Sequence, residues 1–127
     1  MKIYGIGTDI VSVDRIKESL KNKKFISRVF NKKEILKCNK IKNPFNCFAK
    51  RFAAKEAFSK ALGTGISNGI NFNEIIVLNK TSGKPYFYLK GKTKKIIDRI
   101  FKNKKLRISL SLSDEKKYAV AFVTFSL

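Results

Sequence analysis

The longest helical pattern in the chain runs from about Phe45 to Leu62, and it constrains the fold more than any other feature. The apolar residues of one face are three, four and seven positions apart, as in an α-helix: they are Phe45, Phe48, Ala49 and Phe52. The next position on that face is Glu56. A carboxylate on a buried face must be paired, hydrogen-bonded or bound to a cation, because an unpaired buried charge is strongly destabilising. The sequence therefore predicts a long central helix whose carboxylate needs a partner.

The rest of the chain predicts a helical first half and a strand-rich second half. Residues 2–13 alternate as a strand that places Gly5, Gly7 and Asp9 on one face, and glycines inside a strand indicate close approach of a backbone or ligand. Capping and breaking residues then mark the helix ends: Ser12 or Asp14, Asn43-Pro44 and Gly63. The expected elements are helices at 13–22, 25–30, 32–40, 45–62 and 92–102 and strands at 74–78, 85–89, 106–112 and 118–125. The predicted fold class is α+β, a mainly antiparallel sheet packed around the long central helix.

Length and composition predict one domain spanning residues 1–127, large enough to bury a core without disulfides. No apolar run is long enough to span a membrane, and Asp9 interrupts the only N-terminal segment that could resemble a signal peptide. Two cysteines, Cys38 and Cys47, do not make a disulfide framework, and without histidine a zinc site is not expected. A cytoplasmic, reducing location is the simplest prediction.

The formal net charge of +20 predicts an anionic partner. The candidates are nucleic acid, a phosphorylated small molecule, an acidic protein and an anionic membrane surface. An AT-biased genome would raise Lys, Asn and Ile together, so a compositional origin for part of the charge stays open.

Asp9 is predicted to face inward from a strand and Glu56 from a helix. Two such carboxylates suit a hard cation such as Mg²⁺. This ion usually binds one or two protein carboxylates and completes its coordination shell with water and phosphate. Lys60 follows Glu56 by one helical turn and offers a cation for phosphate. Three simpler interpretations remain open at this point. Glu56 and Lys60 form an ordinary salt bridge, Asp9 caps the end of its strand, and the glycines after Leu62 only stop the helix.

Two long motifs carry a resemblance to a known family. Residues 5–16, Gly-Ile-Gly-Thr-Asp-Ile-Val-Ser-Val-Asp-Arg-Ile, resemble the first signature of the holo-acyl-carrier-protein synthases, which are 4′-phosphopantetheinyl transferases. Residues 51–65, Arg-Phe-Ala-Ala-Lys-Glu-Ala-Phe-Ser-Lys-Ala-Leu-Gly-Thr-Gly, resemble the second. Shorter matches at 83–85 and 109–113 fall in the family's order, so the resemblance covers nearly the whole chain.

The resemblance implies transfer of the phosphopantetheine arm of coenzyme A to a serine of an acyl carrier protein, for fatty acid biosynthesis. Asp9 and Glu56 match the magnesium-binding carboxylates, and Glu56, directly or through a metal-bound water, would take the proton of the serine hydroxyl. Lys60 matches a phosphate-contacting lysine. The remaining expected coenzyme A contacts are Arg51, Ser59, Gly63, Lys84 and Pro85.

The resemblance also implies an acidic carrier protein as the partner of the basic surface. The expected carrier-protein contacts are Arg15, Phe25 and Arg28. A homotrimer with active sites at the subunit contacts is expected as well. The chain departs from the family at Asp114, where a histidine is usual, so that no histidine serves as the base here.

The alternative is a basic nucleic-acid-binding protein, for instance a ribosome-associated one, which only the charge favours. The aromatic residues are mainly Phe at core-like spacing and form no stacking platform for bases, so a nucleic-acid partner is not expected. A peripheral membrane protein would need an amphipathic helix with an exposed apolar face, and no such helix is predicted.

Overall fold

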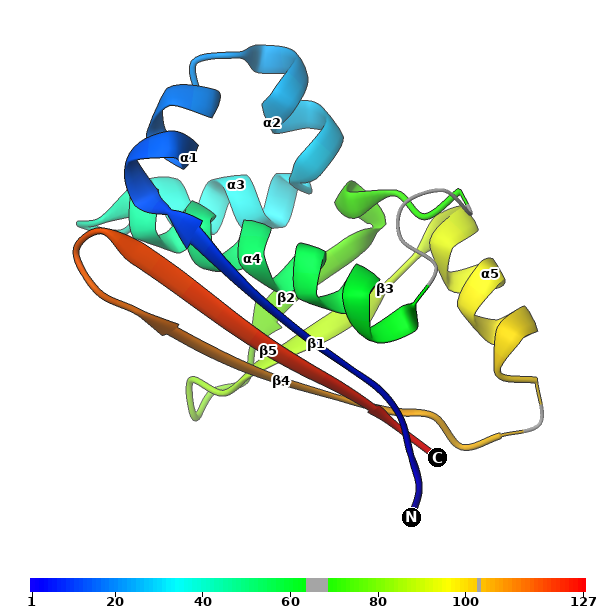
Figure 1. The fold of residues 1–127 in the computed structure, drawn as a ribbon. Coiled ribbons are helices and arrows are strands. Elements are labelled where there is room, and N and C mark those ends of the chain that lie inside the picture. Colours follow the sequence, from blue (N-terminus) through cyan, green and yellow to red (C-terminus); the bar gives the residue numbers. More distant parts are fainter. Residues whose placement is uncertain (64–68, 103) are drawn as a thin grey trace.

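The structure, a computed structural model, describes residues 1–63, 69–102 and 104–127 (Figure 1). The helical elements are α1 (Val13–Ser19), α2 (Lys23–Val29), α3 (Lys32–Asn39), α4 (Pro44–Leu62), the 3-10 turn η2 (Phe72–Glu74) and α5 (Gly91–Ile100). The strands are β1 (Ile3–Ser12), β2 (Ile75–Asn79), β3 (Pro85–Leu89), β4 (Arg107–Asp114) and β5 (Tyr118–Ser126). Every predicted helix and strand is present, with ends shifted by a few residues at most.

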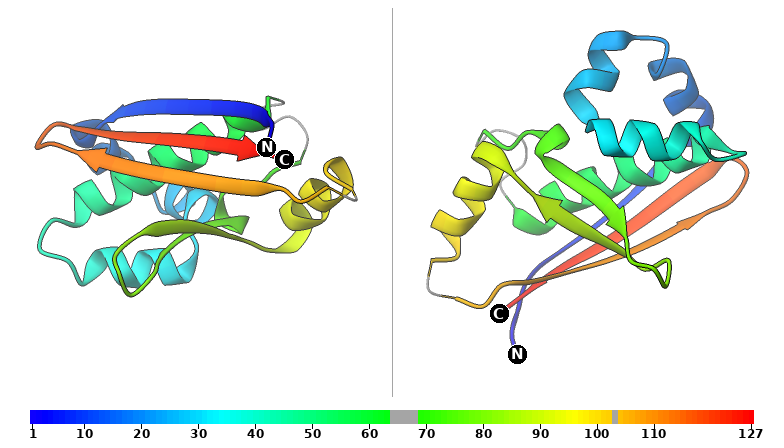
Figure 2. Two further views of the ribbon diagram at one scale, coloured as in Figure 1. Left: turned by 90° about the horizontal axis from the view of Figure 1, so that it is seen from below. Right: turned by 180° about the vertical axis from the view of Figure 1, so that it is seen from behind.

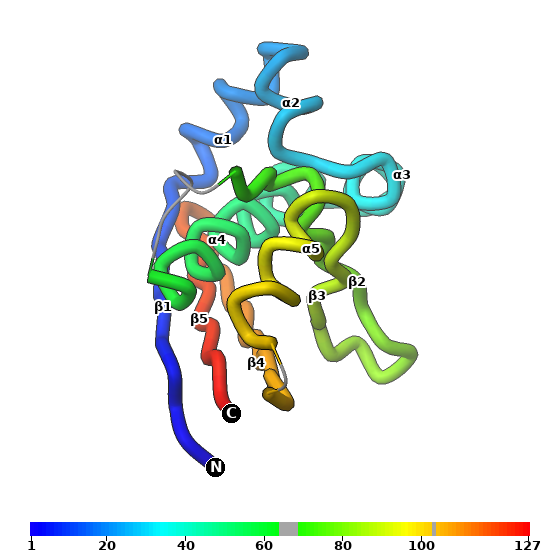
Figure 3. Tube along the Cα trace, turned by 90° about the vertical axis from the view of Figure 1, so that its right-hand side faces the viewer, coloured from blue at the N-terminus to red at the C-terminus, as the bar shows by residue number. Residues whose placement is uncertain are grey.

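The strands form two antiparallel sheets on opposite sides of α4. One has the order β1-β5-β4, and the other is the β2-β3 hairpin. Figure 3 shows β1 and β5 on one side of α4 and the hairpin on the other, with β3 beside β4. The view from below in Figure 2 shows the three strands in the order β1, β5, β4. The predicted α+β class is confirmed, although the strands are divided between two sheets because α4 lies between them. The helices α1 to α3 cover one end of this arrangement.

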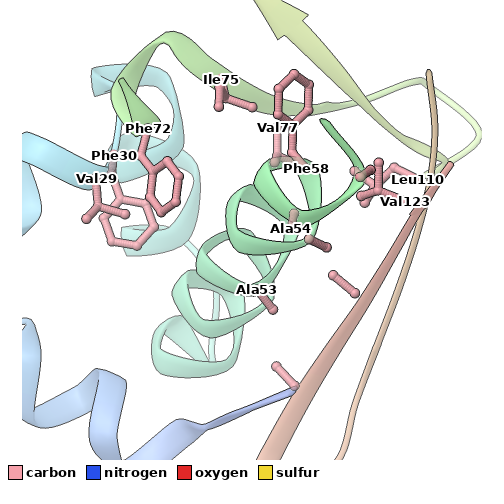
Figure 4. Close-up of a cluster of buried hydrophobic side chains, with 14 of the residues drawn as sticks. Val29, Phe30, Ala53, Ala54, Phe58, Phe72, Ile75, Val77, Leu110 and Val123 are labelled. Atoms are coloured by element: carbon pink, nitrogen blue, oxygen red, sulfur yellow. The ribbon is translucent and has the colours of Figure 1, made fainter. Parts of the chain in front are cut away.

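The hydrophobic core surrounds α4. The fully buried Phe58 lies edge-on to Phe87 of the hairpin and to Phe125 of the three-stranded sheet, with ring centroids 5.1 and 5.0 Å apart respectively. Figure 4 shows Phe58 between residues of both sheets, and Phe30 and Phe72 in a second group at the other flank of the helix. The central helix is therefore packed on most of its circumference, and one edge, with Phe52, Glu56 and Lys60, is only partly covered. Among the described residues, no helix has both the length and the hydropathy needed to cross a membrane.

The capping and helix-breaking residues named above lie at the ends of the helices. The side chain of Ser12 accepts a hydrogen bond from the backbone amide of Arg15 and so caps α1. Pro44 occupies the first turn of α4, and Gly63 ends that helix in the left-handed conformation with φ of 86°. The predicted glycine-rich segment continues through Gly65, which lies outside the described residues.

The burial of α4 differs from the predicted stripe. The fully buried positions that face the three-stranded sheet are small, Ala53, Ala57 and Ala61, whereas Phe52 and Glu56 are only half-buried. Small side chains allow a helix to approach a sheet closely, so the deepest face of α4 is the alanine face. Glu56 therefore lies at the border of the core and not within it.

Cys38 at the end of α3 and Cys47 in the first turns of α4 form a disulfide, with Cα atoms 5.4 Å apart. The sequence prediction of no disulfide framework missed this pair. The sequence separation of 9 residues gave no sign of it, because the pairing depends on how α3 packs against α4.

Candidate active site

The glycine face of β1 lies directly on the backbone of α4. A Cβ atom on Gly5 would lie 2.0 Å from the carbonyl oxygen of Ala61, and one on Gly7 would lie 1.9 Å from that of Ala57. Only glycine leaves room for this contact. The predicted close approach of another backbone is confirmed, and it brings Asp9, two residues further along the same face, to the exposed edge of α4.

Asp9 forms an ion pair with Lys60. The Nζ atom of Lys60 lies 3.2 Å from Oδ1 of Asp9 and also donates a hydrogen bond of 3.0 Å to the carbonyl oxygen of Thr8. The Asp9 side chain is 16% exposed and that of Lys60 55%. The alternative in which Lys60 pairs with Glu56 is therefore wrong: Lys60 bridges from α4 to β1.

Glu56 lies beside this ion pair, in surroundings that disfavour its charged form. Burial raises the pKa of its carboxyl, the negative charge of Asp9 raises it further, and Lys60 opposes them. Within the described residues, no salt-bridge partner of Glu56 lies within 4.0 Å. Asp9 and Glu56 are neighbouring carboxylates that repel each other, and a cation bound between them would relieve this repulsion.

The three side chains line one cavity of about 400 Å³. Its other wall comes from α1 and α2, including Arg15, Ser19 and Phe25. The carboxylate pair therefore faces a space large enough for a small ligand, since such sites occupy roughly 300–1,000 Å³. Two of the predicted carrier-protein contacts, Arg15 and Phe25, belong to this wall.

A second cavity, of about 370 Å³, adjoins the first along α4. The two share Phe52 and Glu56, and the second is completed by η2 and α2 with Arg28, Ile70 and Phe72 among its walls. Phe52 packs between Phe25 and Phe72, with ring centroids 5.8 and 6.4 Å away. Glu56 thus stands at the junction of a polar cavity and a more apolar one, and Arg28 lies beside that junction.

The other predicted coenzyme A contacts do not line the cavity of Asp9, Glu56 and Lys60. Arg51 is 3% exposed, and its guanidinium donates to the carbonyl oxygen and Sγ of Cys47 and to Oδ1 of Asn79, with burial lowering its pKa. Lys84 and Pro85 lie on the β2-β3 hairpin, on the side of α4 away from β1 (Figure 3). Ser59 is 4% exposed, and Gly63 lies at the end of α4.

Asp114 joins the β4-β5 hairpin to the first turns of α4. Its Oδ2 accepts a hydrogen bond of 2.9 Å from the side-chain amide of Asn46, and its Oδ1 lies 3.5 Å from Nζ of Lys50. The residue that stands where the family usually has histidine therefore contacts α4 at the end opposite to Gly63.

Sequence reasoning missed a buried ion pair directly behind the site. Lys55 donates hydrogen bonds of 2.7 Å each to Oε1 of Glu34 and to the carbonyl oxygens of Phe72 and Ile75, and both charged side chains are 0% exposed. The pair ties α4 to α3, η2 and β2 next to Glu56. The spacing of Asn31 and Glu34, a helix capping box, was the available signal for the position of Glu34.

The donor set at the site fits Mg²⁺. No group of three or more His, Cys, Asp or Glu side chains among the described residues could enclose a metal ion, so the protein offers the two carboxylates of Asp9 and Glu56. Magnesium commonly binds through one or two carboxylates and keeps water and phosphate as its other ligands. The repulsion between the two carboxylates, which adds to burial in raising the pKa of Glu56, supports the same conclusion.

Comparison with known proteins places the chain in a family. Residues 5–126 match the 4′-phosphopantetheinyl transferase superfamily. The holo-[acyl-carrier-protein] synthase of Pelagibacter ubique (strain HTCC1062) is 54% identical over 123 residues, covering 97% of this chain and 96% of the relative. That of Vibrio campbellii (strain ATCC BAA-1116) is 42% identical over 127 residues, covering 98% of each chain.

Solved structures agree with these sequence relatives. The crystal structure of the holo-[acyl-carrier-protein] synthase from Neisseria meningitidis superposes with a TM-score of 0.84 at 41% identity, covering 98% of this chain and 99% of that one. The Helicobacter pylori enzyme in complex with coenzyme A gives 0.78 at 32% identity, covering 95% and 99%. The predicted resemblance is confirmed over nearly the full length, and it favours the transferase over the nucleic-acid-binding alternative. The chain belongs to the holo-[acyl-carrier-protein] synthases of the 4′-phosphopantetheinyl transferase superfamily.

Proposed function

We propose that Asp9 and Glu56 are the carboxylates with which this enzyme transfers the 4′-phosphopantetheine group of coenzyme A to a serine of an acyl carrier protein, the step that readies the carrier for fatty acid biosynthesis. The observation that carries the proposal is the meeting of these two carboxylates and Lys60 on one cavity, brought about by the contact between β1 and α4. A cytoplasmic location remains a prediction.

Asp9 and Glu56 would hold Mg²⁺ together with the pyrophosphate of coenzyme A. The metal, when bound, neutralises negative charge that develops on the phosphate oxygens as the phosphoryl bond breaks. Lys60, which bridges from α4 to Asp9, would add a second positive charge beside those oxygens.

Glu56 is the candidate general base. A serine hydroxyl must lose its proton as its oxygen attacks phosphorus, and a base works best when its pKa is close to the working pH. Burial and the charge of Asp9 raise the pKa of Glu56 in that direction. The carboxylate at the junction of two cavities can accept the proton directly or through a water.

The carrier protein would approach from the side of α1 and α2. Arg15 and Phe25 line the same cavity as the carboxylates, and Arg28 lines the adjoining one. An arginine beside an apolar aromatic ring suits an acidic partner with an apolar spot, because the charge steers the encounter and the ring supplies buried area.

We further propose a homotrimer formed through the outer face of the β1-β5-β4 sheet. This face carries large apolar side chains that are 45–65% exposed, which is unusual for a solvated surface: Ile6, Ile10, Tyr118 and Phe122. A subunit contact would bury them. Such a contact would also bring Lys84 of one protomer to the carboxylate pair of its neighbour. Within one protomer, Lys84 lies across α4 from that pair.

The direct test incubates the protein with coenzyme A and an apo-carrier protein and follows the gain in carrier mass. We expect transfer only with Mg²⁺, and losses of at least about 100-fold in Asp9→Asn and in Glu56→Gln. Asp98→Asn, which removes an exposed carboxylate paired with Lys94, serves as the matched control and should stay active. Full activity in both site variants would contradict the metal-site assignment.

The shared-site proposal has its own test. Glu56→Gln and Lys84→Ala are each expected to lose most activity as pure proteins. If neighbouring protomers supply the two groups, unfolding and refolding the two variants together restores part of the activity, because some sites then receive both native residues. No recovery in mixtures shown to be mixed oligomers would place both residues in one protomer's site.

A further inference from the structure

A third cavity, of about 520 Å³, lies between α2, the start of α3 and η2. It shares no lining residue with the cavity of Asp9, Glu56 and Lys60. Asn73 stands between it and the second cavity, and the side-chain amide of Asn73 donates a hydrogen bond of 3.1 Å to the carbonyl oxygen of Ser27. This link between η2 and α2 separates the third cavity from the catalytic residues.

Three apolar side chains form part of the wall of this cavity, together with polar and charged ones. Phe30 is 2% exposed, and its ring packs edge-on against Phe48 of the core with centroids 5.0 Å apart. Ile26 and Ile35 add two half-buried aliphatic side chains from α2 and α3. Such a surface favours a ligand with an apolar body, because burying that body removes its surface and that of the wall from water.

The charged groups at this cavity are mostly positive. Lys23, Lys32 and Lys90 all line it, and all three are exposed. Glu74 is the acidic residue among the lining side chains, and its carboxylate is already engaged.

Four donors hold the Glu74 carboxylate. The backbone amides of Lys92 and Thr93 donate at 3.2 and 3.0 Å, the Thr93 hydroxyl at 2.8 Å and the side-chain amide of Asn71 at 3.1 Å. The carboxylate therefore caps the N-terminus of α5, and the field left for a ligand is positive.

We propose that this cavity binds a small amphiphilic anion. Its apolar body would lie against Ile26, Phe30 and Ile35, and its single anionic head would lie among the three lysines. A small hydrated anion would make no apolar contact with the cavity wall, and a neutral hydrocarbon would make no ionic contact with the lysines. The volume is within the range of roughly 300–1,000 Å³ found for small-molecule sites, where a few charged groups orient a largely apolar ligand.

The test titrates the full-length protein with octanoate by calorimetry, with octan-1-ol as the neutral probe of the same length. We expect saturable binding of octanoate and at least about tenfold weaker binding of octan-1-ol, because only octanoate has a charge for the lysines. The double variant Lys32→Glu/Lys90→Glu should lose at least about tenfold in octanoate affinity. The control Lys37→Glu/Lys105→Glu makes the same change of total charge at two exposed lysines outside the cavity. It should keep the octanoate affinity of the native protein.

A cavity-filling variant tests the apolar part. Ser27 is exposed and lines the cavity, so Ser27→Phe should block octanoate while its thermal midpoint stays close to that of the native protein. Three results would overturn the proposal: no saturable binding of octanoate, equal affinity for octan-1-ol, or equal losses in the two double variants. Unchanged octanoate binding in Ser27→Phe would place the ligand elsewhere and overturn it too.

Discussion

At the scale of single residues, the surroundings of Glu56 disfavour its charged form, which lowers the stability of the fold but suits a metal ligand or base. Burial and the charge of Asp9 raise its pKa above the usual value, so the folded protein holds the Glu56 proton more tightly than the unfolded chain does. The contribution of Glu56 to stability is therefore present at low pH and is lost as pH rises through the raised pKa. At neutral pH and without metal, the ionised Glu56 destabilises the fold.

Replacing Glu56 by its neutral isostere should consequently separate stability from activity. We expect Glu56→Gln at pH 7 and without Mg²⁺ to raise the thermal midpoint by roughly 1–4 °C while transfer is lost. Thermal scans from pH 4 to 8 should show the difference shrinking as the native carboxyl becomes protonated. A variant less stable than the native protein at pH 7 would show that Glu56 is already compensated inside the protomer.

The affinity for Mg²⁺ should depend on pH through the titration of the Glu56 carboxyl. The metal requires the carboxylate form, so affinity should fall as pH drops through the raised pKa of Glu56, and binding near that pH should release protons. Calorimetry in two buffers of different ionisation enthalpy measures the released protons directly. Glu56→Gln should abolish the release, and release unchanged in that variant would assign it to another group.

The buried Lys55–Glu34 pair predicts a large loss of stability on removing one partner. Lys55→Met keeps the length of the side chain but leaves the Glu34 carboxylate buried without its cation, at a cost of about 3–5 kcal/mol. Lys94→Met breaks the exposed pair with Asp98 and should cost about 0.3–0.5 kcal/mol. Urea unfolding of both variants measures the contrast.

A control distinguishes charge from packing at Lys55. Adding Glu34→Gln to Lys55→Met removes the uncompensated charge and should recover part of the lost stability. A double variant as unstable as the sum of both single changes would instead assign the loss to the hydrogen bonds with η2 and β2.

At the scale of elements, the contact between β1 and α4 creates the site. Gly7→Ala would place a methyl group against the carbonyl of Ala57 and must push the strand from the helix, at a cost of about 1–3 kcal/mol or more. The displacement should also reduce transfer, because Asp9 and Lys60 lie on the two separated elements. Lys95→Ala, at an exposed position of α5, is the control for unfolding and activity measurements. Normal activity in a folded Gly7→Ala protein would contradict this account.

The element ends were predictable because single residues mark them. Ser12, Pro44 and Gly63 each impose a local conformation that needs no tertiary contact, and the structure has a helix end at each. The two carboxylates were found for a related reason: each breaks the polarity pattern of its own element.

Long-range arrangements were not predictable in the same way. Nothing local in the sequence shows that Lys60 prefers Asp9 to Glu56, or that the hairpin carrying Lys84 lies across α4 from β1. The Cys38–Cys47 disulfide and the Lys55–Glu34 pair depend likewise on how α3 packs against α4. Such contacts follow from the assembled layers and not from the periodicity of one segment.

At the scale of the whole molecule, the net charge of +20 should act on the encounter with an acidic carrier protein. Two stretches are densest in cations: residues 21–42 around α2 and α3, and residues 90–107 around α5. Only the first adjoins the cavity of Asp9 and Glu56, through the wall formed by α2. Positive charge near that cavity should orient the carrier protein as it binds. Positive charge around α5 should add only to the overall attraction between the two proteins.

This distinction can be measured in the transfer reaction. We expect the KM for carrier protein to rise steeply between about 50 and about 300 mM salt with kcat nearly constant, because screening weakens steering and not chemistry. At low salt, Arg28→Glu in the first stretch should raise that KM at least about tenfold, while Lys105→Glu, with the same change of charge near α5, should raise it about twofold or less. If both variants raise KM equally, the carrier responds to total charge alone, and the orientation assigned to the α1–α2 side is wrong.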